Sequence, residues 1–190
     1  MKLIIFIFVF NSFGIFSIDR KERVEYRKNI ISGYNNKQYK EIIPLLEKYT
    51  SMFPDEILFQ LYLAKSYLHY NNFSSTDDLN KEEIFKVRNY YSKSTVLFSK
   101  VLPMIEEKTP LDKNLGEWYF YWGLAEMFSG RDELAIKKFI KSSKLKPSIK
   151  ENYYNLALIN EKFNNPKDSD RYFLLYNKLV ELEKEKSIEK

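Results

Sequence analysis

Hydrophobic residues recur at intervals of three and four along most of the chain, and short polar breaks divide them into segments. This spacing places apolar side chains on one face of an α-helix. The pattern predicts helices over about 24–34, 39–52 and 55–70. Phe53–Pro54 ends the second of these, because proline disfavours helical geometry in the residue before it. A polar stretch at 71–78 reads as a loop.

Start signals mark the helices that follow. Asn80 with Glu83 forms a capping-box pattern that begins a long helix to about residue 107. An interruption of this helix at Pro103 is an open alternative. Ser148 with Glu151 forms a second capping-box pattern, for a helix over about 149–163. Asn165–Pro166 begins the last helix, since proline is tolerated at the first helical position.

No stretch shows sustained two-residue alternation, so the sequence predicts an all-α protein. Between 116 and 147 the pattern predicts two short helices joined by a turn at 129–132. This pair serves as the reference for an internal repeat. Its marker positions are Tyr119, Trp122, Gly123, Gly130, Ala135, Phe139, Ser142 and Pro147.

These positions resemble the tetratricopeptide repeat, whose period is about 34 residues. Glu126 departs from the pattern, since a tyrosine is usual there. Small residues at Gly123 and Ala135 suit a close approach of the paired helices. Stepping by the period gives units at about 23–54, 57–107 with an insertion, 116–147 and 150–180. In the first unit, Ile30 and Ile42 occupy both small-residue positions.

The resemblance implies a right-handed solenoid of about four helical hairpins over residues 19–182, followed by a charged tail at 183–190. A generic helical bundle with coincidental spacing is the alternative. In a solenoid of this family the first helices of the hairpins line a concave face. That face would carry Arg27, Lys28 and Ile31 in the first unit. In later units it would carry a candidate partner-binding groove of Tyr62, Lys65, Phe120, Tyr121, Leu124, Met127, Phe128, Tyr154, Asn155 and Leu158.

The helix over 117–129 is apolar on nearly all sides, so we expect both of its faces to be covered. One possibility is that the long second helix and the 102–115 connection fold against it. The other is that an apolar or amphipathic peptide occupies the groove. By the family resemblance, Asn155 would hydrogen-bond the backbone of such a peptide.

The amino terminus predicts a targeting segment. Met1–Lys2 precede an apolar run over 3–10, and the chain becomes charged at Asp19. This is the pattern of an export signal, which favours a periplasmic, envelope or secreted location. A membrane anchor formed by residues 3–18 is the alternative, although 16 residues fall short of the roughly 20 that span a bilayer. A buried core element is the third reading.

Composition adds few constraints. The chain of 190 residues has a formal net charge of +5, which is weak support for an anionic partner. The lysines at 137, 138, 141, 144 and 146 cluster on one predicted helix, where the only cations are lysines and no arginine alternates with exposed aromatics. This argues for a solvated face and against nucleic-acid binding. The absence of cysteine excludes disulfides and thiolate metal sites.

We find no chemistry-bearing motif. His69 is the single histidine, and the chain has no glycine-rich phosphate loop, nucleophile elbow or zinc pattern. We therefore predict no catalytic residues, no metal and no cofactor. The sequence predicts a non-enzymatic scaffold that binds a protein or peptide. An assembly subunit that forms homo-oligomers through its last helix, around Tyr172, Tyr176 and Leu179, is the alternative, and an enzyme with an unrecognised acidic site ranks third.

Overall fold

The computed structural model describes residues 19–71, 79–109, 112, 114–188, and within them it contains eight α-helices and no strands. The predicted leader at 1–18, most of the 71–78 loop and the final two residues of the tail lie outside the described residues. The helices are α1 (Arg20–Asn35), α2 (Tyr39–Met52), α3 (Ile57–Leu68), α4 (Lys81–Lys108), α5 (Leu115–Phe128), α6 (Asp132–Leu145), α7 (Lys150–Lys162) and α8 (Pro166–Ile188).

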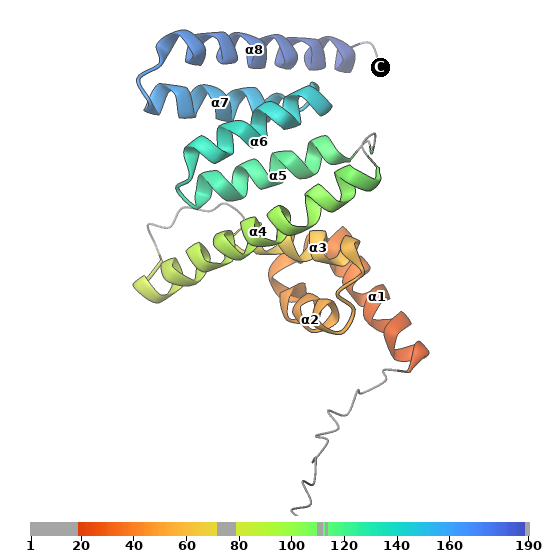
Figure 1. The fold of residues 1–190 in the computed structure, drawn as a ribbon. Coiled ribbons are helices and arrows are strands. Elements are labelled where there is room, and N and C mark those ends of the chain that lie inside the picture. The colour runs from red at the N-terminus through yellow and green to blue at the C-terminus, as the bar shows by residue number, and fades with distance from the viewer. Residues whose placement is uncertain (1–18, 72–78, 110–111, 113, 189–190) are drawn as a thin grey trace, which may run out of the picture.

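Successive helices pack as hairpins, and the hairpins stack from α1 at one end to α8 at the other (Figure 1). Each helix contacts the next one along the chain, and α3 also contacts α5. Such neighbour-to-neighbour packing is the hallmark of a repeat array. The all-α prediction is confirmed. The right-handed sense of the solenoid remains a prediction.

The backbone repeats with the predicted register. The non-glycine residues with positive φ are Lys37 and Asn164, and Gly130 is the glycine with positive φ, among the described residues. Lys37 and Gly130 are 93 residues apart, as are Pro54 and Pro147, and Gly130 and Asn164 are 34 apart. The residue that follows each positive-φ residue donates its backbone amide to the carbonyl five residues earlier, as in a Schellman helix end. The repeat is therefore a property of the backbone as well as of the sequence.

Helices that end before a proline also end alike. Phe53, Thr109 and Lys146 have φ between −128° and −141° and ψ between 67° and 79°. Each precedes a proline in the sequence. The proline ring disfavours helical geometry at the preceding residue and so sets this common extended end.

The second unit departs from the period by lengthening its second helix. Ala64 and Pro110 are 46 residues apart, whereas Gly123 and Pro147 are 24 apart, so this unit holds 22 additional residues. The α4 helix has 28 residues against 14 in α6. The predicted Asn80–Glu83 capping box opens it, with both hydrogen bonds at 3.0 Å. Pro103 does not interrupt the helix, because it lies on the exposed side where the freed carbonyl can be hydrated.

The second capping-box prediction is wrong. The N-cap residue of α7 is Ile149, and no side chain caps this end. The helix begins at Lys150, so Ser148 lies one residue outside the cap position. Asn165–Pro166 does begin α8 as predicted, and the Asn165 side chain donates to Asp168 Oδ2 at 2.8 Å.

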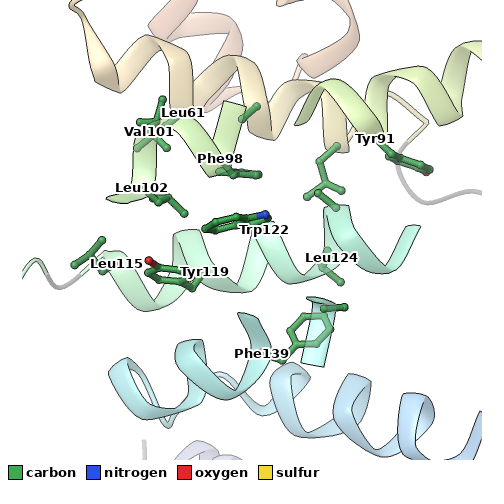
Figure 2. Close-up of a cluster of buried hydrophobic side chains, with 14 of the residues drawn as sticks. Leu61, Tyr91, Phe98, Val101, Leu102, Leu115, Tyr119, Trp122, Leu124 and Phe139 are labelled. Carbon is green, nitrogen blue, oxygen red and sulfur yellow. The ribbon is translucent and has the colours of Figure 1, made fainter. Parts of the chain in front are cut away.

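The largest buried cluster spans α3 to α7, and much of it is drawn in Figure 2. Trp122 of α5 lies between that helix and α4, on the side of Phe98 and Leu102, while Phe139 of α6 packs from the other side (Figure 2). A second cluster joins α1, α2 and α3. The α3 helix contributes to both, with Leu61, Ala64 and Leu68 in the first and Phe59, Leu63 and Tyr67 in the second.

Glycines set the closest helix approaches. A Cβ atom on Gly123 would lie 2.5 Å from Cε1 of Phe139, which confirms the small-residue role predicted for this position. In the first unit, the corresponding room comes from Gly33, where a Cβ atom would lie 2.3 Å from Cγ2 of Ile42. The repeat alignment had placed Ile30 at the small position there. Ile30 instead fills the core, and the close approach is displaced by three residues along α1.

Charged pairs join one hairpin to the next. Lys141 of α6 donates to Glu106 of α4 at 2.6 Å, and Tyr119 of α5 donates to the same carboxylate at 2.8 Å. The Lys141 ammonium is the main reason that the pKa of Glu106 lies below its ordinary value. Lys162 of α7 pairs with the nearly buried Asp132 of α6. These contacts supplement the apolar packing between units.

We expect Gly123→Ala to lower the free energy of unfolding by about 1 to 2 kcal/mol. The gain in helix propensity is smaller than the cost of pressing a methyl group into the fully buried Phe139 ring. Urea unfolding measures this. Phe139→Leu makes room for the methyl group, so the double variant should lose less than the sum of the two single losses by at least about 0.5 kcal/mol. Additive losses would contradict the contact.

Candidate functional site

Other helices cover most of the α5 surface. None of its residues from Leu115 to Phe128 is exposed, although its sequence is apolar nearly all round. The ring of Phe128 stacks on Tyr91 of the lengthened α4, with centroids 5.2 Å apart, and Leu124 lies in the core. Phe120 packs toward Phe139, with ring centroids 6.0 Å apart. Of the two alternatives, burial by the protein's own helices accounts for this face.

An open groove nevertheless lies beside α5. Its cavity volume is about 570 Å³. Residues of α1, α3 and α5 and of the end of α4 line it together with the connection before α5. The lining residues are Tyr34, Ile57, Leu58, Leu61, Tyr62, Lys65, Ile105, Lys108, Thr109, Asp112, Asn114, Glu117 and Trp118. We call this the α3 groove, because α3 supplies five of its lining residues. Leu58, about half exposed, is its most accessible apolar residue.

Aromatic rings and one lysine form the inner wall of the α3 groove. Tyr34 and Tyr62 stack with centroids 3.8 Å apart. The Lys65 ammonium lies 4.0 Å from the ring centroid of Tyr121 and 5.5 Å from that of Tyr34. These are cation–π distances. Burial lowers the pKa of Lys65, although the Glu117 carboxylate acts in the opposite sense. The groove therefore presents a partly buried cation beside aromatic rings.

The predicted groove residues divide into separate places. Tyr62 and Lys65 line the α3 groove, and Tyr121 lies directly behind Lys65. Phe120, Leu124, Met127 and Phe128 belong to, or pack against, the buried cluster. Tyr154 lies toward the far end of the stack, where its ring meets Phe173 and Tyr176 of α8. Asn155 is buried, and Leu158 is partly exposed on the same helix.

Arg27, Lys28 and Ile31, which were expected on the same concave face, lie apart from the α3 groove. Together with Val24 and Ser32 they line a shallow hollow on α1 that shares no lining residue with the groove.

Several groove residues were missed from the sequence. Leu58, Trp118 and Asp112 line the cavity but were not assigned to it. Leu58, Tyr62 and Lys65 follow the helical spacing of one face, so this spacing could have pointed to Leu58. Asp112 belongs to the connection after α4, whose path has no sequence signal of this kind.

The last helix packs its apolar stripe mainly on α7. Tyr172, Phe173, Leu175, Tyr176 and Leu179 are all half-buried. The exposed positions of α8 are mostly polar, with Leu174 and Leu182 as apolar exceptions. This is the pattern of a capping helix in a repeat array. Oligomerisation through this helix remains a prediction.

Glu126, which stands where the repeat pattern usually has a tyrosine, has both a hydrogen-bond donor and an ion-pair partner in the structure. Its carboxylate is buried and accepts a hydrogen bond from Trp122 Nε1 at 2.7 Å. Arg131, in the α5–α6 turn, pairs with it and also donates to Thr95 of α4. A buried carboxylate is stable only when it is paired and hydrogen-bonded. The glutamate thus ties α5, the following turn and α4 together at one point.

His69 lies at the end of α3, near the α3 groove. Its ring stacks on Tyr39 with centroids 4.6 Å apart and meets Tyr121 edge-on at 5.8 Å. Burial, with the nearby ammonium groups of Lys65 and Lys37, lowers the pKa of His69 to about 4. The neutral imidazole therefore prevails in the folded chain at neutral pH.

Among the described residues, no cluster of three histidine, cysteine or acidic side chains could hold a metal ion. Within the same part of the chain, none of the helices combines the length and apolar character that a membrane span requires.

Of the comparisons with known proteins, only the one with solved structures gives matches, and these concern the fold. No protein-family model matches the chain, and no curated protein matches its sequence. A solved structure described as "MamA RS-1 ArsTM double mutant" superposes with a TM-score of 0.64 at 14% identity, over 87% of this chain and 79% of the other. One described as "MamA MSR-1 C2" gives a TM-score of 0.45 at 21% identity, over 85% and 98%.

The MamA proteins are tetratricopeptide-like helical repeat proteins, so the first of these matches supports the same fold for this chain. At 14% identity it supports a shared fold and nothing more specific. The predicted tetratricopeptide-like fold is confirmed.

We expect Glu126→Ala to destabilise the chain by about 2 to 4 kcal/mol, because it leaves Trp122 Nε1 without its acceptor and removes the partner of Arg131. Chemical unfolding measures the loss. Glu133→Ala removes an exposed carboxylate from α6 and serves as the control, with a change within about 0.5 kcal/mol. Equal losses in the two variants would contradict the assigned role.

The single histidine gives an unambiguous titration by NMR. We expect its resonance to shift with a midpoint near pH 4 in the folded chain, against about 6.5 when unfolded. Since the folded-state pKa is depressed, the associated stability is present above about pH 6.5 and is lost as pH falls toward 4. His69→Gln should therefore lose less stability than the wild type between pH 7 and pH 5. A midpoint near 6.5 in the folded chain would contradict this assignment.

Proposed function

We propose that this chain is a non-enzymatic scaffold that binds a peptide segment of a partner protein in the α3 groove. The observation that carries the proposal is the open cavity of about 570 Å³ between the first helices of three successive hairpins, in a tetratricopeptide-like fold. Stacked first helices of a repeat array create extended surfaces of this kind.

The lining supports a peptide with an apolar anchor. Leu58, Ile57 and Tyr62 offer apolar and aromatic surface at the floor and rim. Binding energy in such sites comes mainly from a few apolar or aromatic anchors in desolvated pockets. Thr109, Asp112 and Asn114 provide hydrogen-bonding groups along one wall, which suit the backbone of an extended chain.

We further propose that the scaffold works in an exported or envelope setting. The support is the leader pattern in the sequence, where a lysine precedes an apolar run and charged residues follow it.

A substitution at the rim tests the groove. We would select binding peptides from a displayed random library on the full chain and measure their affinities by fluorescence anisotropy. Leu58→Arg places a long charged side chain in the groove at an exposed position, so the fold should persist. We expect it to weaken the selected peptides by at least about tenfold, which corresponds to about 1.4 kcal/mol.

Leu174→Arg is the matched control, since Leu174 is an exposed helical leucine on α8, outside the groove. It should bind the peptides as the wild type does. Peptides that bind Leu58→Arg with unchanged affinity would overturn the proposed site.

A further inference from the structure

The outer face of α1 carries basic residues around an apolar centre. Arg20, Lys21, Arg27 and Lys28 flank Val24 and Ile31, and all six are exposed. At 100° per residue they fall within an arc of roughly 120° on the helix. The two acidic residues of this helix segment, Glu22 and Glu25, lie outside the arc. We call the six residues the α1 basic face.

No helix of the described part of the chain covers this face. The α1 helix packs on α2 and lies at the end of the stack (Figure 1). Val24 is 59% exposed and Ile31 39% exposed, and both line the shallow hollow on α1. They are exposed apolar residues next to unneutralised charge.

The cations of the face are largely unpaired. Within the described residues, Arg20, Lys21 and Lys28 have no carboxylate within 4.0 Å. Arg27, at the edge of the face, lies 3.8 Å from Glu56 and 5.5 Å from the Phe59 ring, so it is shared with the core side. Arg23, the remaining cation of the segment, pairs with Glu56 and belongs to the inner side.

We propose that the α1 basic face binds the anionic headgroups of a phospholipid membrane. A helix with a central apolar stripe flanked by lysine and arginine lies in the plane of a membrane interface. Each basic residue near an anionic surface contributes about 1 kcal/mol.

The sequence on the amino-terminal side supports a lipid partner over other anions. The apolar run over 3–10 precedes Arg20 in the sequence, so the basic face follows an apolar segment within the same chain. This face has no aromatic side chain on which a base of a nucleic acid could stack, and its apolar centre would make no favourable contact with a phosphate backbone. This inference concerns a surface distinct from the α3 groove and stands independently of peptide binding.

Vesicle co-sedimentation of the full chain tests the proposal. Because the amino-terminal apolar run could itself enter any bilayer, the readout is the ratio of affinities for phosphatidylcholine vesicles with and without phosphatidylglycerol. Lys21→Gln with Lys28→Gln removes two charges, so we expect this ratio to fall by about tenfold to thirtyfold. Added salt should reduce the wild-type ratio toward that of the variant.

Lys137→Gln with Lys144→Gln is the matched control, since it removes two exposed lysines from α6 and lowers the formal charge equally, from +5 to +3. It should keep the wild-type ratio. Val24→Ser with Ile31→Ser should weaken binding to the anionic vesicles. Circular dichroism verifies that each variant stays helical.

Three results would overturn the proposal. One is a wild-type chain with no preference for anionic vesicles. Another is an equal loss in the α1 and α6 variants, which would reduce the effect to net charge. The third is an oligonucleotide affinity that the α1 variant abolishes while vesicle binding stays unchanged, which would assign the face to nucleic acid.

Discussion

The burial of α5 is the constraint on which the rest of the structure depends. A helix that is apolar all round is stable only if other elements cover each of its faces. Here α3, α4 and α6 each supply a wall, and the additional turns of α4 bring Tyr91 onto Phe128. The insertion in the second unit is thus coupled to the sequence of the third.

Much of the fold follows from local sequence signals. Helix periodicity, the Asn80–Glu83 cap and the prolines act over a few residues, so they predict helices and turns, and the 34-residue spacing adds the register of the repeat. The site depends on packing between units, which these signals do not encode. Phe128 looked available because its partner, Tyr91, lies 37 residues away in the sequence. The same holds for Glu126, because its partner Arg131 lies beyond the end of α5 and in turn donates to Thr95 of α4.

The two proposed surfaces depend on different kinds of interaction. The α3 groove uses partly desolvated groups, where Lys65 lies against aromatic rings and short-range contacts dominate. The α1 basic face uses hydrated cations, which act over roughly a Debye length and depend on salt. Ionic strength would therefore modulate attachment at one end of the stack while leaving recognition in the groove largely unaffected. Tyr34 of α1 contributes to the groove wall, so the two surfaces share one helix.

The two-sided packing of α3 has a consequence for proteolytic trimming. A cut in the short link between α2 and α3 that released the first hairpin would uncover Phe59, Leu63 and Tyr67, each at most 5% exposed in the intact chain. Adjacent apolar side chains of this kind form the contiguous patches that drive aggregation. The shortened chain would be a substrate for chaperones and degradation. The first hairpin therefore keeps one apolar side of α3 out of solvent.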